Sequence, residues 1–184
     1  MMMDDATRKE SKRQHKFNQC IALNDNRIGI ILTKGKICVI DSADYHLIKN
    51  FTWGAKNTKK FNNYYAKTSF RLENGKFTTL TLHRLIMNIR DSKNEIDHIN
   101  HDTLNCSRIN LRVANKSENM CNRKIFKNNL SGFKNICWNE LRQKWVVRII
   151  KNHVKHWKFF DNISDACEWK NKMLPVIHGK FHHD

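Results

Sequence analysis

The sequence has little proline and glycine and no closely spaced cysteine pair. One Pro and six Gly stand among 184 residues, which argues against long linkers and low-complexity segments. The six cysteines are scattered, with no C-x-x-C pair, so the spacing of a disulfide framework or of a cysteine-based zinc site is missing. We therefore expect most cysteines to be small buried side chains in a reducing compartment, and we expect no structural zinc.

Long apolar runs are also missing. The longest one, residues 28–32, is far shorter than the roughly 18 residues that a membrane span needs. Residues 1–16 are charged and lack the apolar core of a secretory signal. They are expected to form a basic polar tail, solvated or lying on phosphates. We therefore expect an intracellular protein, in the cytoplasm or nucleus of a host cell, that is neither secreted nor bound to a membrane.

Acidic residues are scarce relative to basic ones. Seventeen Asp and Glu against 34 Lys and Arg give a net charge of +17. This excess favours a polyanionic partner, either nucleic acid or an anionic membrane surface. The hydrophobic fraction of 40% is sufficient for ordinary globular cores, in one compact domain or in two to three small modules.

The hydrophobic pattern divides the chain into three segments after the tail, and together they predict an α+β fold. Residues 17–80 predict a β-rich module of short strands, with turns at Lys34-Gly35 and Asn74-Gly75 and a short helix over 44–51. Residues 81–128 begin with a short helix over 81–87 and predict the order strand, polar loop, strand, helix from residue 96 onward. Residues 129–184 predict three half-buried antiparallel strands and a helix that ends or kinks at Pro175.

The middle segment carries the residues with the most informative chemistry. Asp97 and His98 end the first expected strand, Asn110 precedes the second, and Asn119 lies on the helix. A carboxylate and an amide oxygen can bind one hard cation such as Mg²⁺ beside an imidazole, which is a natural base at neutral pH. Taken singly, each residue also has an ordinary structural interpretation, such as a turn cap for Asn110.

The same segment resembles the HNH endonucleases, in particular phage and intron homing endonucleases with the ββα-metal fold. The resemblance covers about residues 80–124. It rests on Glu95-Ile96-Asp97-His98-Ile99-Asn100, Asn105, Arg108-Ile109-Asn110-Leu111-Arg112-Val113, Ser117-Glu118-Asn119 and Asn122-Arg123, with Thr81-Leu82-His83-Arg84-Leu85-Ile86-Met87 as the lead-in.

The resemblance implies a role for each matching position. Asp97 and Asn119 would bind Mg²⁺ or another divalent cation such as Mn²⁺, His98 would be the general base, and Asn110 would orient it. His83 would contact the scissile phosphate or pack behind the cleft. Asn119 stands where other members have a final His, which argues against zinc but not against catalysis.

The C-terminal segment is strongly basic. Residues 121–160 contain ten Lys or Arg and one acid. The runs Ser131-Gly132-Phe133-Lys134-Asn135-Ile136-Cys137-Trp138, Lys144-Trp145-Val146-Val147-Arg148-Ile149 and Trp157-Lys158-Phe159-Phe160, with Ala166 and His178-Gly179-Lys180-Phe181, resemble the AP2-like (ethylene-response-factor) DNA-binding domain. Pro175 departs from that family's helix. The resemblance and the basic pattern predict DNA contacts by Arg142, Lys144, Arg148, Lys155, Lys158 and Trp138.

These patterns predict a metal-dependent DNA endonuclease of the HNH homing type, of viral or mobile-element origin. Its expected partner is double-stranded DNA, with no obligate protein partner. Two alternatives remain open: a non-catalytic DNA-binding regulator that retains both folds, and a protein that binds or cleaves RNA.

Overall fold

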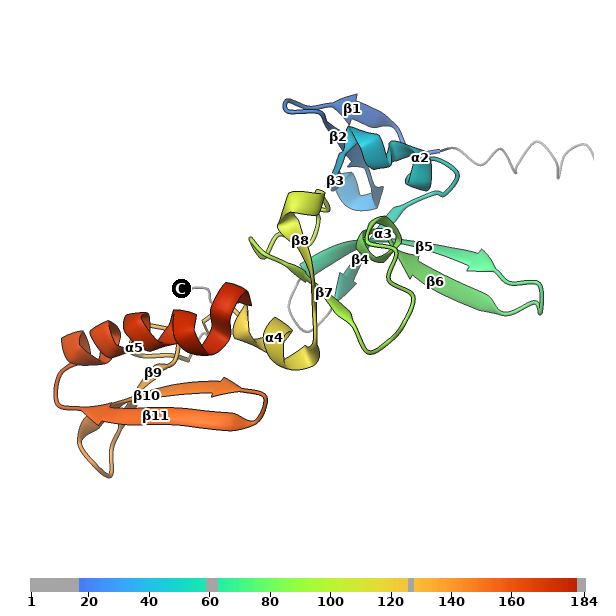
Figure 1. Cartoon of the computed structure of the whole chain (residues 1–184). Coiled ribbons are helices and arrows are strands. Elements are labelled where there is room, and N and C mark those ends of the chain that lie inside the picture. The colour runs from blue at the N-terminus through green and yellow to red at the C-terminus, as the bar shows by residue number, and fades with distance from the viewer. Residues whose placement is uncertain (1–16, 59–62, 126–127, 182–184) are drawn as a thin grey trace, which may run out of the picture. The chain divides into compact units, whose positions relative to one another are not determined.

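A computed structural model describes residues 17–58, 63–125 and 128–181; the predicted tail, residues 1–16, lies outside them. The chain forms two compact units, one comprising the residues up to Arg90 with Asp102–Leu111 and the other Asp91–His101 with the residues from Arg112 onward. Several small antiparallel sheets and few helices make up these units (Figure 1), as in an α+β protein. The module boundaries expected after residues 80 and 128 stay predictions.

The first unit contains two antiparallel three-stranded sheets. Their strands follow chain order: β1 (Cys20–Ala22), β2 (Arg27–Ile31) and β3 (Ile37–Asp41), then β4 (Gly54–Thr58), β5 (Asn63–Arg71) and β6 (Phe77–Thr81). Short helices lie between and after them: η2 (Thr33–Gly35), η3 (Ser42–Asp44), α2 (Tyr45–Ile48), α3 (Leu82–Ile86) and η4 (Arg108–Asn110). The helix expected over residues 44–51 is thus only one turn of α-helix.

Both predicted turns occur where the chain adopts positive φ. Lys34 and Gly35 have φ of 62° between β2 and β3, and Gly75 has φ of 81° between β5 and β6. Glycine adopts this region at little cost because it lacks a Cβ. The turns let each strand fold back on its predecessor, so the first unit consists of sequence-local antiparallel pairs.

The cysteines of the described chain are all free thiols, but they are not all buried. Cys38, Cys106 and Cys121 are buried and Cys167 is half-buried, whereas Cys20 and Cys137 are exposed. A hydrogen bond of 3.6 Å with the Cys38 thiol, together with burial, raises the pKa of Cys106 well above its usual value. The expectation of burial therefore holds for only part of the set.

The second unit contains the strand pair, helix and sheet predicted for the rest of the chain. β7 (Glu95–His98) pairs with β8 (Leu111–Ala114), and α4 (Lys116–Cys121) follows. Its first turn carries a capping box, in which the Asn115 side chain accepts a hydrogen bond from the Glu118 backbone and the Glu118 side chain accepts one in return. The C-terminal elements are β9 (Ile136–Asn139), β10 (Lys144–Lys151), β11 (Val154–Phe160), α5 (Ile163–His178) and η5 (Gly179–Phe181).

Helix α5 covers one face of the β9–β11 sheet (Figure 1). The buried cluster between them comprises Ile136, Val147, Ile149, Ala166 and Leu174. Side chains alternate between the two faces of a strand. Val147 and Ile149 of β10 therefore face α5. The alternate residues of β10, Lys144, Val146, Arg148 and Ile150, and the residues of β9 and β11 that pair with them form the opposite face of the sheet, which we name the outer face.

Of the two outcomes predicted for Pro175, an end or a kink of the helix, the end does not occur. The helix continues to His178 and stops at Gly179, whose φ is 58°. Proline removes the hydrogen bond to the carbonyl four residues earlier, but Pro175 and Asn171 are both exposed, so water can satisfy that carbonyl. Burial of Leu174 and His178 on either side of the proline favours continuation of the helix.

Within residues 17–58, 63–125 and 128–181, every helix is too short or too polar to cross a bilayer.

The sheet core supplies a stability test with a neighbouring control. Ile149 is fully buried and the adjacent Ile150 is 52% exposed. Ile149→Ala should lower the free energy of unfolding by about 2–5 kcal/mol, because it leaves a cavity beneath α5. Ile150→Ala should change it by less than about 1 kcal/mol. Urea denaturation of both variants measures the difference, and equal losses would contradict the assignment of faces.

Candidate functional site

Asp97 is a buried carboxylate in the second unit, and both of its oxygens accept hydrogen bonds. Its side chain is 6% exposed. Oδ1 accepts from Nδ2 of Asn122 at 2.8 Å, and Oδ2 accepts from Nε of Arg112 at 2.7 Å. A buried carboxyl group without such partners would be costly, so these hydrogen bonds stabilise the side chain of Asp97 in its place on β7.

Asn119 of α4 and Asn122, the residue that caps the C-terminus of α4, present two amides to two carboxylates of β7. Asn119 and Asn122 are one helical turn apart and share a helix face, while Glu95 and Asp97 share a strand face. Nδ2 of Asn119 donates to Oε2 of Glu95, as Nδ2 of Asn122 does to Asp97. The predicted residues Asp97 and Asn119 thus lie on two elements that pack against each other, but each bonds to a different partner.

His98, the predicted base, is buried at the end of β7 and has a well-defined backbone. Its carbonyl accepts a hydrogen bond from Nδ2 of Asn122 at 3.1 Å and another from the backbone N–H of His101 at 3.0 Å. His101 adopts φ of 63°, which turns the chain directly after the strand. These two bonds hold the backbone at the end of the strand that carries His98.

Asn110 lies in the first unit, at the end of the loop that follows Asp102. Its Nδ2 donates to the carbonyl of Asn105 at 2.7 Å, and its side chain is buried. Because the amide nitrogen donates to a carbonyl, the amide oxygen is the atom suited to accept a hydrogen bond from an N–H group.

Arg108 holds this loop in place. Its guanidinium donates to both carboxylate oxygens of the buried Asp44, at 2.7–3.1 Å, and to the carbonyl of Ile86 at 3.1 Å. The hydrogen bonds with Asp44 raise the pKa of Arg108 above its usual value. The Arg108–Asp44 ion pair therefore fixes the backbone two residues before Asn110, within the same unit.

His83, also in the first unit, lies on α3. Its Nε2 is 3.5 Å from the hydroxyl of Thr81, and its ring lies 5.6 Å from that of Tyr65. The side chain is 9% exposed. The first unit therefore carries His83 and Asn110 as buried polar side chains, and the second carries Asp97, His98 and Asn119.

The helix–strand contact in the second unit offers oxygen atoms suited to a hard divalent cation. Nδ2 of Asn119 points to Glu95, which leaves its Oδ1 as the potential ligand, and each Asp97 oxygen retains a further lone pair. Oδ1 of Asn122 is buried and has no hydrogen-bond partner in the described chain. Such an orphaned acceptor is unusual in a folded protein and is consistent with a position for an ion or water. The donor set fits Mg²⁺ or Mn²⁺.

The β-sheet separates the predicted DNA-contacting residues by face. Arg148 and Lys144 belong to the outer face by alternation along β10, and Lys155 belongs to it because it pairs with Ile150. The guanidinium of Arg142 lies 4.7 Å from the ring of Phe159, which pairs with Val146 on that face.

Two predicted contacts lie on the face that α5 covers. Lys158 pairs with Val147, and Trp138 pairs with Trp145 with ring centroids 5.1 Å apart. Trp157, which the prediction omitted, pairs with Arg148 on the outer face and is 58% exposed. Trp157 lies two residues from both Lys155 and Phe159, so strand alternation could have predicted from the sequence that it shares their face.

A groove of about 660 Å³ lies between α4 and the sheet within the second unit. Five cationic residues contribute to its lining: Lys116, Arg123, Lys124, Lys134 and Arg148. No carboxylate of the described chain lines it. A concave surface with charge of one sign concentrates an oppositely charged ligand, so the groove suits a polyanion.

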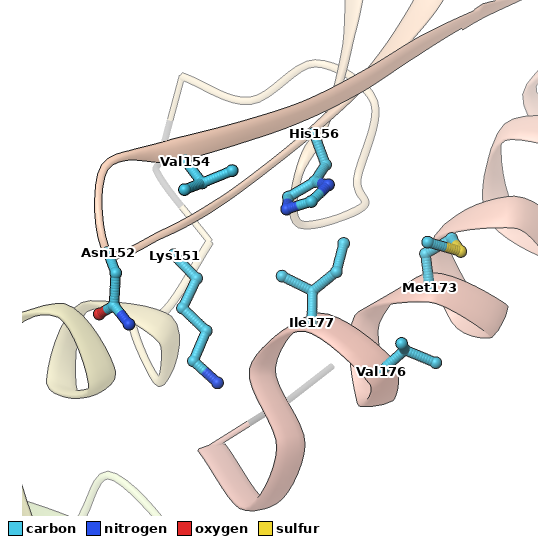
Figure 2. A pocket seen from close by; sticks show the side chains of 7 residues that line it. All are labelled: Lys151, Asn152, Val154, His156, Met173, Val176 and Ile177. Carbon is cyan, nitrogen blue, oxygen red and sulfur yellow. The ribbon is translucent and has the colours of Figure 1, made fainter.

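A smaller hollow lies where the β10–β11 turn meets the last turns of α5. Figure 2 shows Val154 and Ile177 facing each other across it, with Lys151 at the rim. It contains none of the predicted site residues, and its mainly apolar lining sets it apart from the basic groove.

Comparison with known proteins places the chain in a phage family. No protein-family model matches it. Over 86 residues it is 31% identical to protein 3.8 of Escherichia phage T7, a match that spans 47% of this chain and 71% of the relative. The chain belongs to the family of T7 protein 3.8. That name states no activity.

A solved structure of the HNH homing endonuclease I-HmuI, described as showing DNA binding and cleavage, is also similar to this protein 3.8 family member. The similarity covers 90% of this chain and 88% of that chain, with 17% identity and a TM-score of 0.31. A TM-score of that size does not establish a shared fold.

Sequence reasoning missed three residues around Asp97 in this member of the protein 3.8 family. Asn122 follows Asn119 by about one helical turn, so helical periodicity alone could have predicted that both side chains point to the same side of the helix. Arg112 lies on the strand expected beside residues 96–99, and Glu95 is two residues before Asp97. No local signal gave their partners, because each bond joins residues at least 15 positions apart.

Asn122 supplies a prediction about this network. Asn122→Ala should lower the free energy of unfolding by about 1–3 kcal/mol, because an acceptor oxygen of the buried Asp97 loses its donor. Met120→Ala, on the exposed side of the same helix, should cost less than about 1 kcal/mol. Chemical denaturation of both variants tests this, and an Asn122→Ala variant as stable as Met120→Ala would show the bond to be unimportant.

Proposed function

We propose that this protein is a metal-dependent DNA endonuclease of the HNH homing type. The observation that carries the proposal is the helix–strand contact, in which the Asn119 amide bonds to the Glu95 carboxylate and the Asn122 amide bonds to the Asp97 carboxylate, next to His98 in the sequence. The Asp97-His98, Asn110 and Asn119 pattern of the sequence supports the same assignment. The reaction is hydrolysis of a DNA phosphodiester bond.

The chain's residues divide the chemistry among them. His98 takes a proton from water as the water oxygen bonds to phosphorus. The resemblance to HNH endonucleases assigns Asn110 the role of orienting this base. The P–O3′ bond breaks, leaving a 5′-phosphate and a 3′-oxygen that takes a proton from solvent. Asp97 and Asn119 would hold Mg²⁺ or Mn²⁺, which when bound stabilises negative charge at the phosphate and the leaving oxygen.

Binding of double-stranded DNA is assigned to the basic surfaces of the second unit. Arg142, Arg148 and Lys155 on the outer face combine with the exposed Trp157, and Arg148 also lines the basic groove. Lys and Arg side chains arranged in this way bind phosphates and position the protein on the duplex. The net charge of +17 adds long-range attraction to DNA.

A non-catalytic DNA-binding protein is the second candidate, and the Asp97–Arg112 ion pair favours it. Arg112 already neutralises the carboxylate at 2.7 Å, so Asp97 has a structural role without any metal. The outer face and the groove serve this function equally well. Cleavage is therefore the property that separates the two candidates.

The phage relative suggests where the protein acts. A phage-encoded nuclease of this class would work inside the infected host cell, on host or phage DNA, and would suit a mobile element.

Cleavage tests the proposed function directly. The wild-type protein should relax or linearise supercoiled plasmid with Mg²⁺ or Mn²⁺, and EDTA should abolish this activity. His98→Ala should lower the cleavage rate by about 10²–10⁴-fold, because the general base is lost. Its affinity for DNA, measured without divalent cations by fluorescence anisotropy, should stay unchanged.

His46→Ala provides a matched control. His46 is exposed in the first unit, where its Nδ1 lies 2.7 Å from the Ala43 carbonyl. This variant should cleave at the wild-type rate. Unchanged cleavage by His98→Ala would remove the base assignment, whereas tight DNA binding by a wild type that never cleaves would favour the second candidate.

Removal of a cation from the outer face of the sheet should weaken DNA binding more than removal of a cation from the face that α5 covers. Arg148→Ala and Lys155→Ala should each weaken binding and reduce the slope of log K against log salt by about 0.9, because one phosphate contact is lost. Lys158→Ala changes the same type of charge on the α5-facing side and should have little effect. Salt titrations of the three variants measure this, with structured RNA as competitor to detect an RNA preference. A flat salt response of the wild type would contradict the assignment.

A further inference from the structure

The guanidinium of Arg112 connects the C-terminal end of the described chain to Asp97. Its Nε donates to Oδ2 of Asp97 at 2.7 Å, and its Nη1 donates to the carbonyl of Lys180. Its central carbon lies 4.4 Å from the centre of the Phe181 ring. One planar group is thus in contact with a carboxylate, a carbonyl and an aromatic face, all within the second unit.

The aromatic partner is itself firmly held. Phe181 is 3% exposed and packs in a small cluster with Ala114 of β8 and Cys121 of α4. These two elements flank Asp97, since β8 pairs with β7 and the C-cap residue of α4, Asn122, bonds to the Asp97 carboxylate. The ring therefore packs against the framework of the site and against the cation that binds its acid.

The arrangement restricts where Arg112 can go. An arginine without fixed partners samples many rotamers, whereas a guanidinium stacked on a buried ring and bonded at two edges is confined to one plane. Lysine could supply the charge but not the planar fork, because its ammonium is a compact point charge. The position of the Asp97 side chain therefore depends on Arg112, which is held by Lys180 and Phe181. These two residues lie more than 80 positions after Asp97 in the sequence.

We propose that Phe181 and the Lys180 carbonyl are positioning elements of the nuclease site, acting through Arg112 on Asp97. This inference rests on the proposed function, and it assigns to the C-terminal 3₁₀ turn, η5, a role beyond DNA binding. Partners of a metal-binding carboxylate of this kind typically contribute about 10–100-fold to metal affinity or activity.

The decisive variant is Phe181→Leu, which keeps an apolar side chain in the cluster but removes the aromatic face. The Mg²⁺ concentration for half-maximal cleavage should rise by about 10-fold or more, while DNA affinity without divalent cations stays at the wild-type value. Phe181→Tyr retains the ring and should cleave like the wild type. Terbium luminescence, a readout independent of cleavage, should show the same loss of cation affinity in Phe181→Leu.

Phe160→Leu is the matched control for general loosening. Phe160 packs against Trp169 in the sheet–helix core, with ring centroids 6.0 Å apart. The same Phe→Leu change there should reduce stability without changing the Mg²⁺ dependence of the folded protein. Equal effects of Phe160→Leu and Phe181→Leu on that dependence would overturn the inference, as would wild-type cation affinity in Phe181→Leu.

A further measurement separates this inference from the proposed function. The Nε–H resonance of Arg112 should be protected from solvent exchange in the wild type and in Phe160→Leu, but not in Phe181→Leu. If the wild type never cleaves DNA and this pattern is found, the positioning role stands and the nuclease proposal fails. If the wild type cleaves but Arg112 is equally protected in all three proteins, the positioning role fails.

Discussion

A carboxylate on a buried strand must be paired, and the second unit is organised around this requirement. Asp97 accepts a hydrogen bond from Arg112 of β8 and another from Asn122, the C-cap residue of α4. An unpaired ionised acid at that depth would cost more than a small unit can compensate. The strand pair and the helix are therefore joined by polar bonds as well as by packing, and the same bonds place the side chains that the proposed chemistry uses.

Helix α4 has two polar faces with opposite partners. Asn119 and Asn122 meet the carboxylates of β7, whereas Ser117 and Cys121 face the C-terminal sheet. There, the Ser117 hydroxyl accepts a hydrogen bond from the Asn152 backbone at 2.8 Å, and the Cys121 carbonyl accepts one from Lys134 at 2.6 Å. Cations also line the groove on that side. The helix that carries the amide ligands of the proposed site is thus part of the basic groove, so a DNA strand bound there would contact the element that positions Asn119.

Much of the local structure followed from the sequence. The strand, loop, strand and helix of residues 95–121, the turns at Gly35 and Gly75, and the three alternating strands of the C-terminal sheet occur as expected. These features depend on short-range physics: alternation, caps and glycine conformation. Pro175 was interpreted by its local rule alone, and the helix does not end there because burial on both sides of an exposed proline outweighs one lost hydrogen bond.

The sequence by itself determined the chemical character of this protein: its excess of cations, its Asp-His-Asn-Asn pattern and the α+β order of its elements. Tertiary structure decided which partners each polar side chain has. Nothing local pairs Asp97 with Arg112, Asn119 with Glu95, or Arg112 with Phe181, and strand register alone assigns Arg148 and Lys158 to opposite faces. The physical reason is that such contacts join residues far apart along the chain, whose meeting depends on how whole strands and helices pack rather than on any neighbouring residue.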